Sequence, residues 1–243
     1  MRSLIAMGLL IGLSASLAFG ADPSPLQIVQ KADLARGPGG AYSVIAKVLD
    51  YSKGKLRTET AYRVYVKGNE LCLVETIEPV RLRGRKLLMN GNDLWFFLPT
   101  IKRPTRVSLQ QRLTGEVSNG DIARTNFAAD YNVRILGTEK IQGTDSYRLE
   151  LKAKSKNVTY DRLEYWVSKT DLKPLRATFF ALSGKPLKNA TYSDFKPSLG
   201  RPVMTRTVIT DYTQPLKRSE LVYGQFRREK LDDSFFNKDS ITE

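Results

Sequence analysis

Short runs in which apolar and polar residues alternate dominate the chain, and this pattern predicts β-strands. The clearest run covers residues 145–153, where Tyr147, Leu149 and Leu151 alternate with charged residues. Residues 55–67 show the same period of two. Successive side chains of a strand point to opposite faces, so each of these strands presents one apolar face to a core.

The same pattern predicts strands along most of the chain beyond residue 40. Most of them are joined by short turns rich in Gly, Asn, Asp and Ser, which favour antiparallel hairpins. The predicted strands are 41–52, 55–67, 71–78, 85–90, 93–98, 131–141, 145–153, 162–168, 174–182, 186–194, 202–211 and 218–227. The sequence therefore predicts a mainly β fold, a single antiparallel meander of about eleven or twelve strands.

Few helices accompany these strands. Residues 23–36 predict one helix, with Ser24 as a cap, Pro25 in the first turn and a glycine-rich stop. Residues 121–129 predict a second, short helix. Residues 99–120 contain two prolines and are predicted to be irregular.

A sheet of this size has one apolar face that needs a cover. The predicted helices are too few to supply it, so the sheet must roll up, dimerise or hold a hydrophobic ligand. The alternative for each apolar residue is an ordinary core position. If the 93–98 strand is shifted by one residue, Phe96 and Leu98 replace Trp95 and Phe97 on the inner face. The candidate cavity residues are Tyr62, Val64, Trp95, Phe97, Tyr147, Leu149, Tyr165 and Phe179.

The N-terminus has the features of a signal peptide. Arg2 precedes an apolar stretch from Leu4 to Leu13, and small residues follow. Cleavage after Gly20 fits the small-x-small rule, cleavage after Ala18 is the competing site, and an uncleaved anchor is the alternative. We therefore expect residues 1–20 to be a signal peptide, and residues 21–243 to be one domain that is soluble after export.

The formal net charge is +14. Such a charge favours anionic surfaces such as phospholipid head groups, lipopolysaccharide or nucleic acid. Export argues against nucleic acid. Candidate contacts to a head group or partner protein are Arg83, Arg85, Arg103 and Arg106, and the alternative for each is a cross-strand ion pair.

Little in the sequence points to catalysis. The chain has no histidine and a single cysteine, Cys72, which excludes histidine-based catalysis, histidine or multi-cysteine metal sites and an internal disulfide. No glycine-rich phosphate-binding motif occurs. A pair of distant carboxylates stays possible but has no positive support. We expect a protein that is not an enzyme and has no cofactor or metal, with Cys72 a small packed residue.

Four features of the central region resemble a known family. They are Arg83-Gly84-Arg85, the run DLWFFLP at 93–99, the row Arg103, Arg106 and Arg112, and NGD at 119–121. Together with an exported helix followed by antiparallel strands, they resemble the LolA/LolB-like superfamily, and within it the exported outer membrane lipoprotein-sorting proteins. This resemblance implies an unclosed half-barrel whose concave face is covered by helices.

The resemblance also implies a function. LolA-like proteins carry lipoproteins across the periplasm between the inner and outer membranes. We therefore expect a periplasmic carrier for an acylated lipid, lipoprotein or other hydrophobic molecule, working with an inner-membrane transporter and touching membrane surfaces transiently. The chain lacks the lipid-attachment cysteine of LolB-type acceptors, which favours a soluble shuttle. The alternative is a non-enzymatic adaptor subunit of a transporter, with a filled core.

Overall fold

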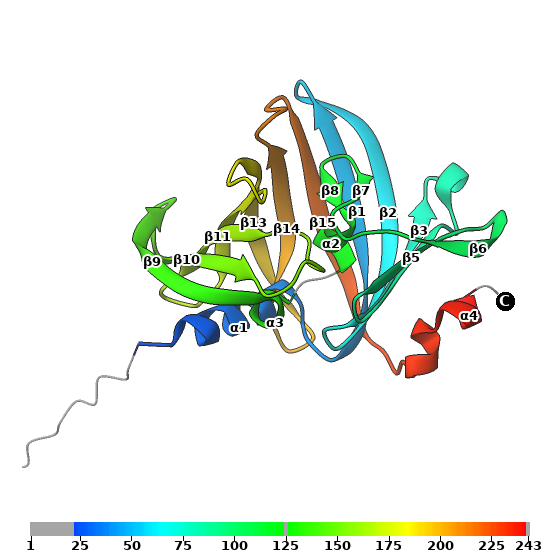
Figure 1. Cartoon of the computed structure of the whole chain (residues 1–243), viewed down its shortest axis with the longest axis horizontal. Coiled ribbons are helices and arrows are strands. Elements are labelled where there is room, and N and C mark those ends of the chain that lie inside the picture. The colour runs from blue at the N-terminus through cyan, green and yellow to red at the C-terminus, as the bar shows by residue number, and fades with distance from the viewer. Residues whose placement is uncertain (1–21, 124–125, 242–243) are drawn as a thin grey trace, which may run out of the picture.

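A strongly curved antiparallel sheet of 13 strands forms the body of the molecule (Figure 1). The computed structural model describes residues 22–123 and 126–241, so the predicted signal peptide lies outside the described residues. The strand order is β6-β5-β4-β3-β2-β1-β15-β14-β13-β12-β11-β10-β9. The strands are β1 (Ala41–Ser52), β2 (Lys55–Lys67), β3 (Leu71–Glu78), β4 (Lys86–Asn90), β5 (Asp93–Leu98), β6 (Ile101–Arg106), β9 (Tyr131–Ile141), β10 (Thr144–Ala153), β11 (Arg162–Ser168), β12 (Pro174–Phe180), β13 (Pro186–Ser198), β14 (Arg201–Asp211) and β15 (Lys217–Arg228).

Two meanders make up this sheet, and β1 joins them by pairing with β15. The pairing runs from Tyr42 opposite Arg228 to Ser52 opposite Lys217. β6 and β9 stand at the two ends of the strand order, so the sheet is unclosed. Register shifts interrupt several pairs, including β1–β15 and β9–β10. Such bulges bend strands and increase their twist, which accounts for the curvature.

Short elements fill the concave side of the sheet (Figure 1). They are α1 (Pro25–Arg36), α2 (Asn119–Ala123), α3 (Phe127–Asp130) and a small hairpin of β7 (Arg112–Thr114) and β8 (Val117–Ser118). Ser24 caps α1 in a capping box with Gln27. We call residues 107–123, which include β7, β8 and α2, the inner segment.

The convex side carries a smaller cover near its β4–β5 edge. It consists of η2 (Asp233–Phe236) and α4 (Lys238–Ile241) at the C-terminal end. Phe236 is fully buried against Leu73, Leu88 and Phe97. The remaining short element, η1 (Val80–Leu82), follows β3.

The predicted fold class is confirmed, and the errors concern the middle of the chain. Residues 99–120 were expected to be irregular, yet they contain the edge strand β6 and the β7–β8 hairpin. β6 pairs with β5 despite Pro104, because an edge strand tolerates a missing backbone donor. The single helix expected at 121–129 is two short helices, α2 and α3, with residues 124–125 outside the described part.

None of the helices in the described ranges is both long and apolar enough to cross a membrane.

Candidate ligand cavity

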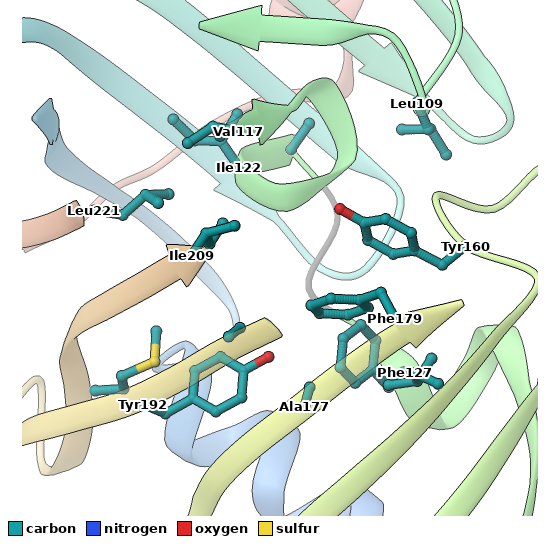
Figure 2. Packing of buried hydrophobic residues seen from close by; sticks show 14 of the residues in the cluster. Leu109, Val117, Ile122, Phe127, Tyr160, Ala177, Phe179, Tyr192, Ile209 and Leu221 are labelled. Carbon is teal, nitrogen blue, oxygen red and sulfur yellow. The ribbon is translucent and has the colours of Figure 1, made fainter. Parts of the chain in front are cut away.

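A small cavity lies inside the main core, between the concave face of the sheet and the inner segment. Its volume is about 60 Å³. An apolar cavity known to bind benzene has a volume of about 150 Å³, so this smaller space accepts an acyl chain only if its walls move. Figure 2 shows Ile122 and Val117 of the inner segment beside Leu221 and Ile209 of the sheet.

A larger groove of about 540 Å³ lies outside the cavity, between α1, α3 and the β2–β3 turn. Groove and cavity share four lining residues, Tyr42, Val66, Gly68 and Asn69, which we call the neck. Gly37, which ends α1, lies so close to Tyr42 that a Cβ there would be 2.9 Å from the tyrosine hydroxyl. The groove therefore leads to the core through a narrow entrance.

A buried ion pair lies where the groove meets the cavity. Asp33 lines the groove and Arg36 lines the cavity, and their side chains are 3.5 Å apart. The Arg36 guanidinium lies 3.8 Å from the centroid of the Phe127 ring. Burial raises the pKa of Asp33 to about 7, although Arg36 and the Ala128 amide, which donates a 2.8 Å hydrogen bond to it, act in the opposite direction.

Polar contacts hold α2 against the sheet. Asp121 accepts a 2.9 Å hydrogen bond from the Tyr160 hydroxyl and lies 3.8 Å from the Lys188 ammonium. A side chain at Gly120 would overlap Thr159, so α2 approaches this strand connection only because position 120 has no Cβ. The NGD motif is thus an anchor for the inner segment, and we call Asp121 and Tyr160 the α2 latch.

A second anchor holds the β7–β8 turn. The Ser219 hydroxyl donates to Asp50 and accepts a 2.8 Å hydrogen bond from the Glu116 amide. Gly115, at a φ of 48°, lies against the Asp50 carboxylate, where a Cβ would overlap it. Burial raises the pKa of the Glu116 carboxyl, with Arg112 opposing the shift from 3.5 Å. These polar contacts, together with the buried side chains of Val117 and Ile122, hold the inner segment at its β7–β8 turn and at α2.

Six of the eight predicted cavity residues lie in the main core. These are Tyr62, Val64, Tyr147, Leu149, Tyr165 and Phe179. Only Val64 and Phe179 also line the cavity itself. The others pack as ordinary core residues.

Trp95 and Phe97 were expected on the concave face, and the structure corrects this. Both belong to the convex cluster around Phe236. The reason is the register of the β4–β5 hairpin, in which Leu94 opposes Met89 and Phe96 opposes Leu87. These four side chains pack on the concave side, so the alternative register was the correct one for Phe96.

The four arginines predicted as head-group or partner contacts differ in their surroundings. Arg106 makes a cross-strand ion pair with Asp93 and lies 5.9 Å from the Trp95 ring centroid, as the alternative reading anticipated. Arg83 donates to the Ile77 carbonyl at 3.0 Å. Arg103 is exposed on the edge strand β6, and Arg85 is half-buried beside β4.

Sequence reasoning missed the buried ion pair and the tyrosines around the cavity. Arg36 continues a four-residue spacing with Ile28 and Ala32, both fully buried, and this spacing was a usable signal for an inward-facing arginine. Cys72, in contrast, is the packed residue expected. Burial raises the pKa of its thiol to about 12, so it is unreactive at neutral pH.

Comparisons with known proteins agree with this geometry. A family model described as "-like: Uncharacterized protein" matches residues 68–243. A LolA superfamily protein from Nitrosomonas europaea is 37% identical with a TM-score of 0.85, and the match covers 90% of this chain and 99% of that one. No curated protein matches the chain.

Two more distant structures share the fold. A domain named as an outer membrane lipoprotein-sorting protein from Vibrio parahaemolyticus is 21% identical with a TM-score of 0.78, covering 90% of this chain and 98% of that one. A DUF1329 family protein from Desulfovibrio piger is 21% identical with a TM-score of 0.77, covering 89% and 97%. At this identity they support the architecture alone.

Proposed function

Because the chain belongs to the LolA superfamily, we propose that it is a periplasmic carrier for an acylated lipid, a lipoprotein or another hydrophobic molecule. The observation that carries the proposal is the groove that leads through the neck into the apolar concave core. The predicted signal peptide would bring residues 21–243 to the periplasm as one carrier domain, where an inner-membrane transporter supplies the cargo.

The binding energy comes from burying acyl methylenes. Each buried methylene contributes about 0.8 kcal/mol, so about eight of them contribute about 6 kcal/mol. That is enough for reversible binding in the micromolar range or just above it. Transfer of this kind makes and breaks no covalent bond, so the carrier acts without enzymatic chemistry.

The small volume of the cavity means that cargo must displace part of its wall. We take the inner segment as the element that moves, because it lies opposite the sheet across the cavity and has polar anchors at its β7–β8 turn and at α2. Protein surfaces and waters can replace such contacts at modest net cost, because an intramolecular hydrogen bond contributes only about 0.5–1.5 kcal/mol. On cargo entry, acyl chains would therefore take the place of this segment's apolar side chains against the concave face of the sheet.

Lipid extraction and native mass spectrometry of protein purified from the periplasm test the proposal. The protein should release a hydrophobic molecule and bind a fluorescent acyl probe afterwards. Val66→Trp, at the neck, should block the probe. Val222→Trp places the same side chain at an exposed position of β15 and should leave probe binding unchanged. A protein that is empty and binds no probe would rule out the carrier.

The 60 Å³ volume also favours a second candidate, a non-enzymatic adaptor subunit of a transporter with a filled core. This candidate predicts that the protein cross-links to an inner-membrane transporter but yields no lipid. For an adaptor, Val66→Trp should leave the cross-link to the transporter unchanged. For a carrier, the same substitution should stop the transfer of lipid, because cargo has to pass the neck.

A further inference from the structure

Two hairpin tips lie side by side at the end of the sheet farthest from α1 (Figure 1). One is the β1–β2 turn with residues 51–57, YSKGKLR, and the other is the β14–β15 turn with residues 212–218, YTQPLKR. The Lys53 amide donates a 2.9 Å hydrogen bond to the Leu216 carbonyl, which joins the two turns. We call these fourteen residues the double tip.

The double tip combines exposed apolar side chains with positive charge. Leu56 is 49% exposed and Leu216 is 64% exposed, and Tyr212 is exposed beside them. Its sequence contains five basic residues and no acidic residue: Lys53, Lys55, Arg57, Lys217 and Arg218. Water hydrates the cations well but not the leucines, so the exposed apolar side chains are the feature of this turn that favours a partner.

Nearby carboxylates do not neutralise this charge fully. Glu59 pairs with Lys47 at 2.9 Å, and Asp50 is engaged by Ser219. Glu220 pairs with Arg218 at 3.1 Å and also with Arg206 at 2.8 Å. In the described part of the chain, no ion pair links Lys53, Lys55 or Arg57 to a carboxylate.

Hydrogen bonds organise the backbone of the turn that displays Leu216. The Asp211 carboxylate accepts hydrogen bonds from the Thr213 amide at 2.6 Å and the Gln214 amide at 3.2 Å. The Arg218 guanidinium lies 4.4 Å from the Tyr51 ring centroid, which fixes the base of the double tip. A turn whose backbone is already organised loses less conformational entropy on binding than a loop without such contacts.

We propose that the double tip docks on an anionic phospholipid bilayer, with Leu56 and Leu216 entering the interface and the basic residues contacting lipid phosphates. Charge complementarity favours a bilayer because its negative surface accepts cations at any lateral position. Apolar side chains among cations are the combination that interfacial anchors use. This goes beyond the proposed carriage of cargo, since docking needs no occupied cavity.

Docking by the double tip fixes the orientation of the molecule. β1 runs from Tyr42 at the neck to Ser52 in the double tip. Ten residues of extended strand span about 33 Å, so the neck and the double tip lie at opposite ends of the sheet. The groove would then face away from the bilayer, toward a protein partner in the periplasm.

Co-sedimentation with vesicles tests this orientation, using protein purified from the periplasm of cells that express the full chain. Vesicles of phosphatidylglycerol and phosphatidylcholine should bind the protein at low salt, and phosphatidylcholine alone should not. The double variant Leu56→Asp/Leu216→Asp should bind at least tenfold more weakly. Lys53→Gln/Lys55→Gln should weaken binding about 25-fold, since each cation near an anionic surface contributes about fivefold.

The matched control is Ile135→Asp/Leu136→Asp, which changes two apolar residues of the edge strand β9 that are 41% and 38% exposed and line neither the cavity nor the groove. It should bind vesicles like the unchanged protein. Circular dichroism checks that all variants fold.

No binding to anionic vesicles, or a larger loss in the β9 variant than in the double-tip variant, would overturn the proposal. The proposal would also be overturned if the double-tip variants kept their vesicle binding but no longer bound an acidic protein. Acyl-probe binding is measured separately, so failure of the cavity and failure of the double tip are told apart.

Discussion

The two faces of the sheet are both rich in aromatic and aliphatic side chains, but they are covered in different ways. On the convex face, Phe236 fills the space between Leu88 and Phe97, and the contact is apolar. On the concave face, the inner segment is held by Asp121 and Asp50 and leaves a cavity. The comparison teaches that the convex cover seals its face, whereas the concave cover, which combines buried apolar side chains with polar anchors, leaves space beneath it. The convex cluster is therefore structural, and the concave core is the candidate site.

Removing Phe236 should give the largest effect on stability. Phe236→Ala empties a fully buried position, and changes of this kind cost about 3–5 kcal/mol. Urea denaturation followed by circular dichroism measures the loss. Phe235→Ala, in the same turn but half-buried, should cost less. Acyl-probe affinity should not change in either variant, and a tenfold loss of probe binding would mean that the two faces are coupled.

Asp33 should make the concave side sensitive to pH. Its pKa is about 7 in the folded protein, against about 4 in an unfolded chain. The folded state therefore binds the extra proton between these values, and stability falls as pH rises through this window. Between pH 5 and pH 8 the loss from this group should be about 3 kcal/mol.

Asp33→Asn is the matched variant for this test. It keeps an oxygen that accepts from the Ala128 amide but cannot titrate. Urea denaturation at both pH values should show a smaller pH dependence in Asp33→Asn than in the unchanged protein. An identical pH dependence in the two proteins would show that Asp33 does not titrate in this range.

Gly115→Ala should destabilise the concave cover. The substitution strains a left-handed backbone position and drives a Cβ into Asp50, which together should cost about 2 kcal/mol. Gly54→Ala is the control, since Gly54 also has a positive φ but nothing lies within 4 Å of its Cβ position. It should cost about 1 kcal/mol. The difference in unfolding free energy between the two variants isolates the contact with Asp50.

The smallest effect should come from the α2 latch. Tyr160→Phe removes the hydrogen bond to Asp121 and should lower stability by about 1 kcal/mol. It should also speed acyl-probe entry, measured by stopped-flow fluorescence. Tyr131→Phe removes another buried hydroxyl bond, to the Tyr160 carbonyl at 2.9 Å, and should lower stability without changing the entry rate. Equal entry rates in both variants would argue against movement of the inner segment.

The sequence predicted the repeating hairpins well, because strand alternation and turn residues are local signals. Ser52 pairs with Lys55 as the Lys53-Gly54 turn required. The sequence predicted wrongly which side chains of β5 face the concave side. Trp95 and Phe97 are as apolar as Leu94 and Phe96, so the pattern alone does not tell the two faces apart, and the outcome depends on what covers each face. The residue that covers the convex face is Phe236, about 140 residues away along the chain. A local sequence pattern around β5 therefore cannot predict this contact.

The candidate site was predicted only in part for a similar reason. Val64 and Phe179 were found because strands that face a core alternate regularly. Arg36 and Asp121 were not predicted to face the cavity, because charged residues in short helices usually face solvent. Pro104 also suggested an irregular stretch, whereas an edge strand accommodates it.

The pairing of β1 with β15 at the centre of the sheet has a consequence for how the protein is made. Asp50 and Ser219, which meet across this pair, are 169 residues apart in the chain. Closing so long a loop is entropically costly and slow, so the two meanders can form early but can join only near the end. A chain that emerges from its N-terminus cannot form the double tip until β15 has emerged. Each newly made molecule thus passes through a stage with two half-sheets and open edges at β1 and β15, the stage at which aggregation is most probable.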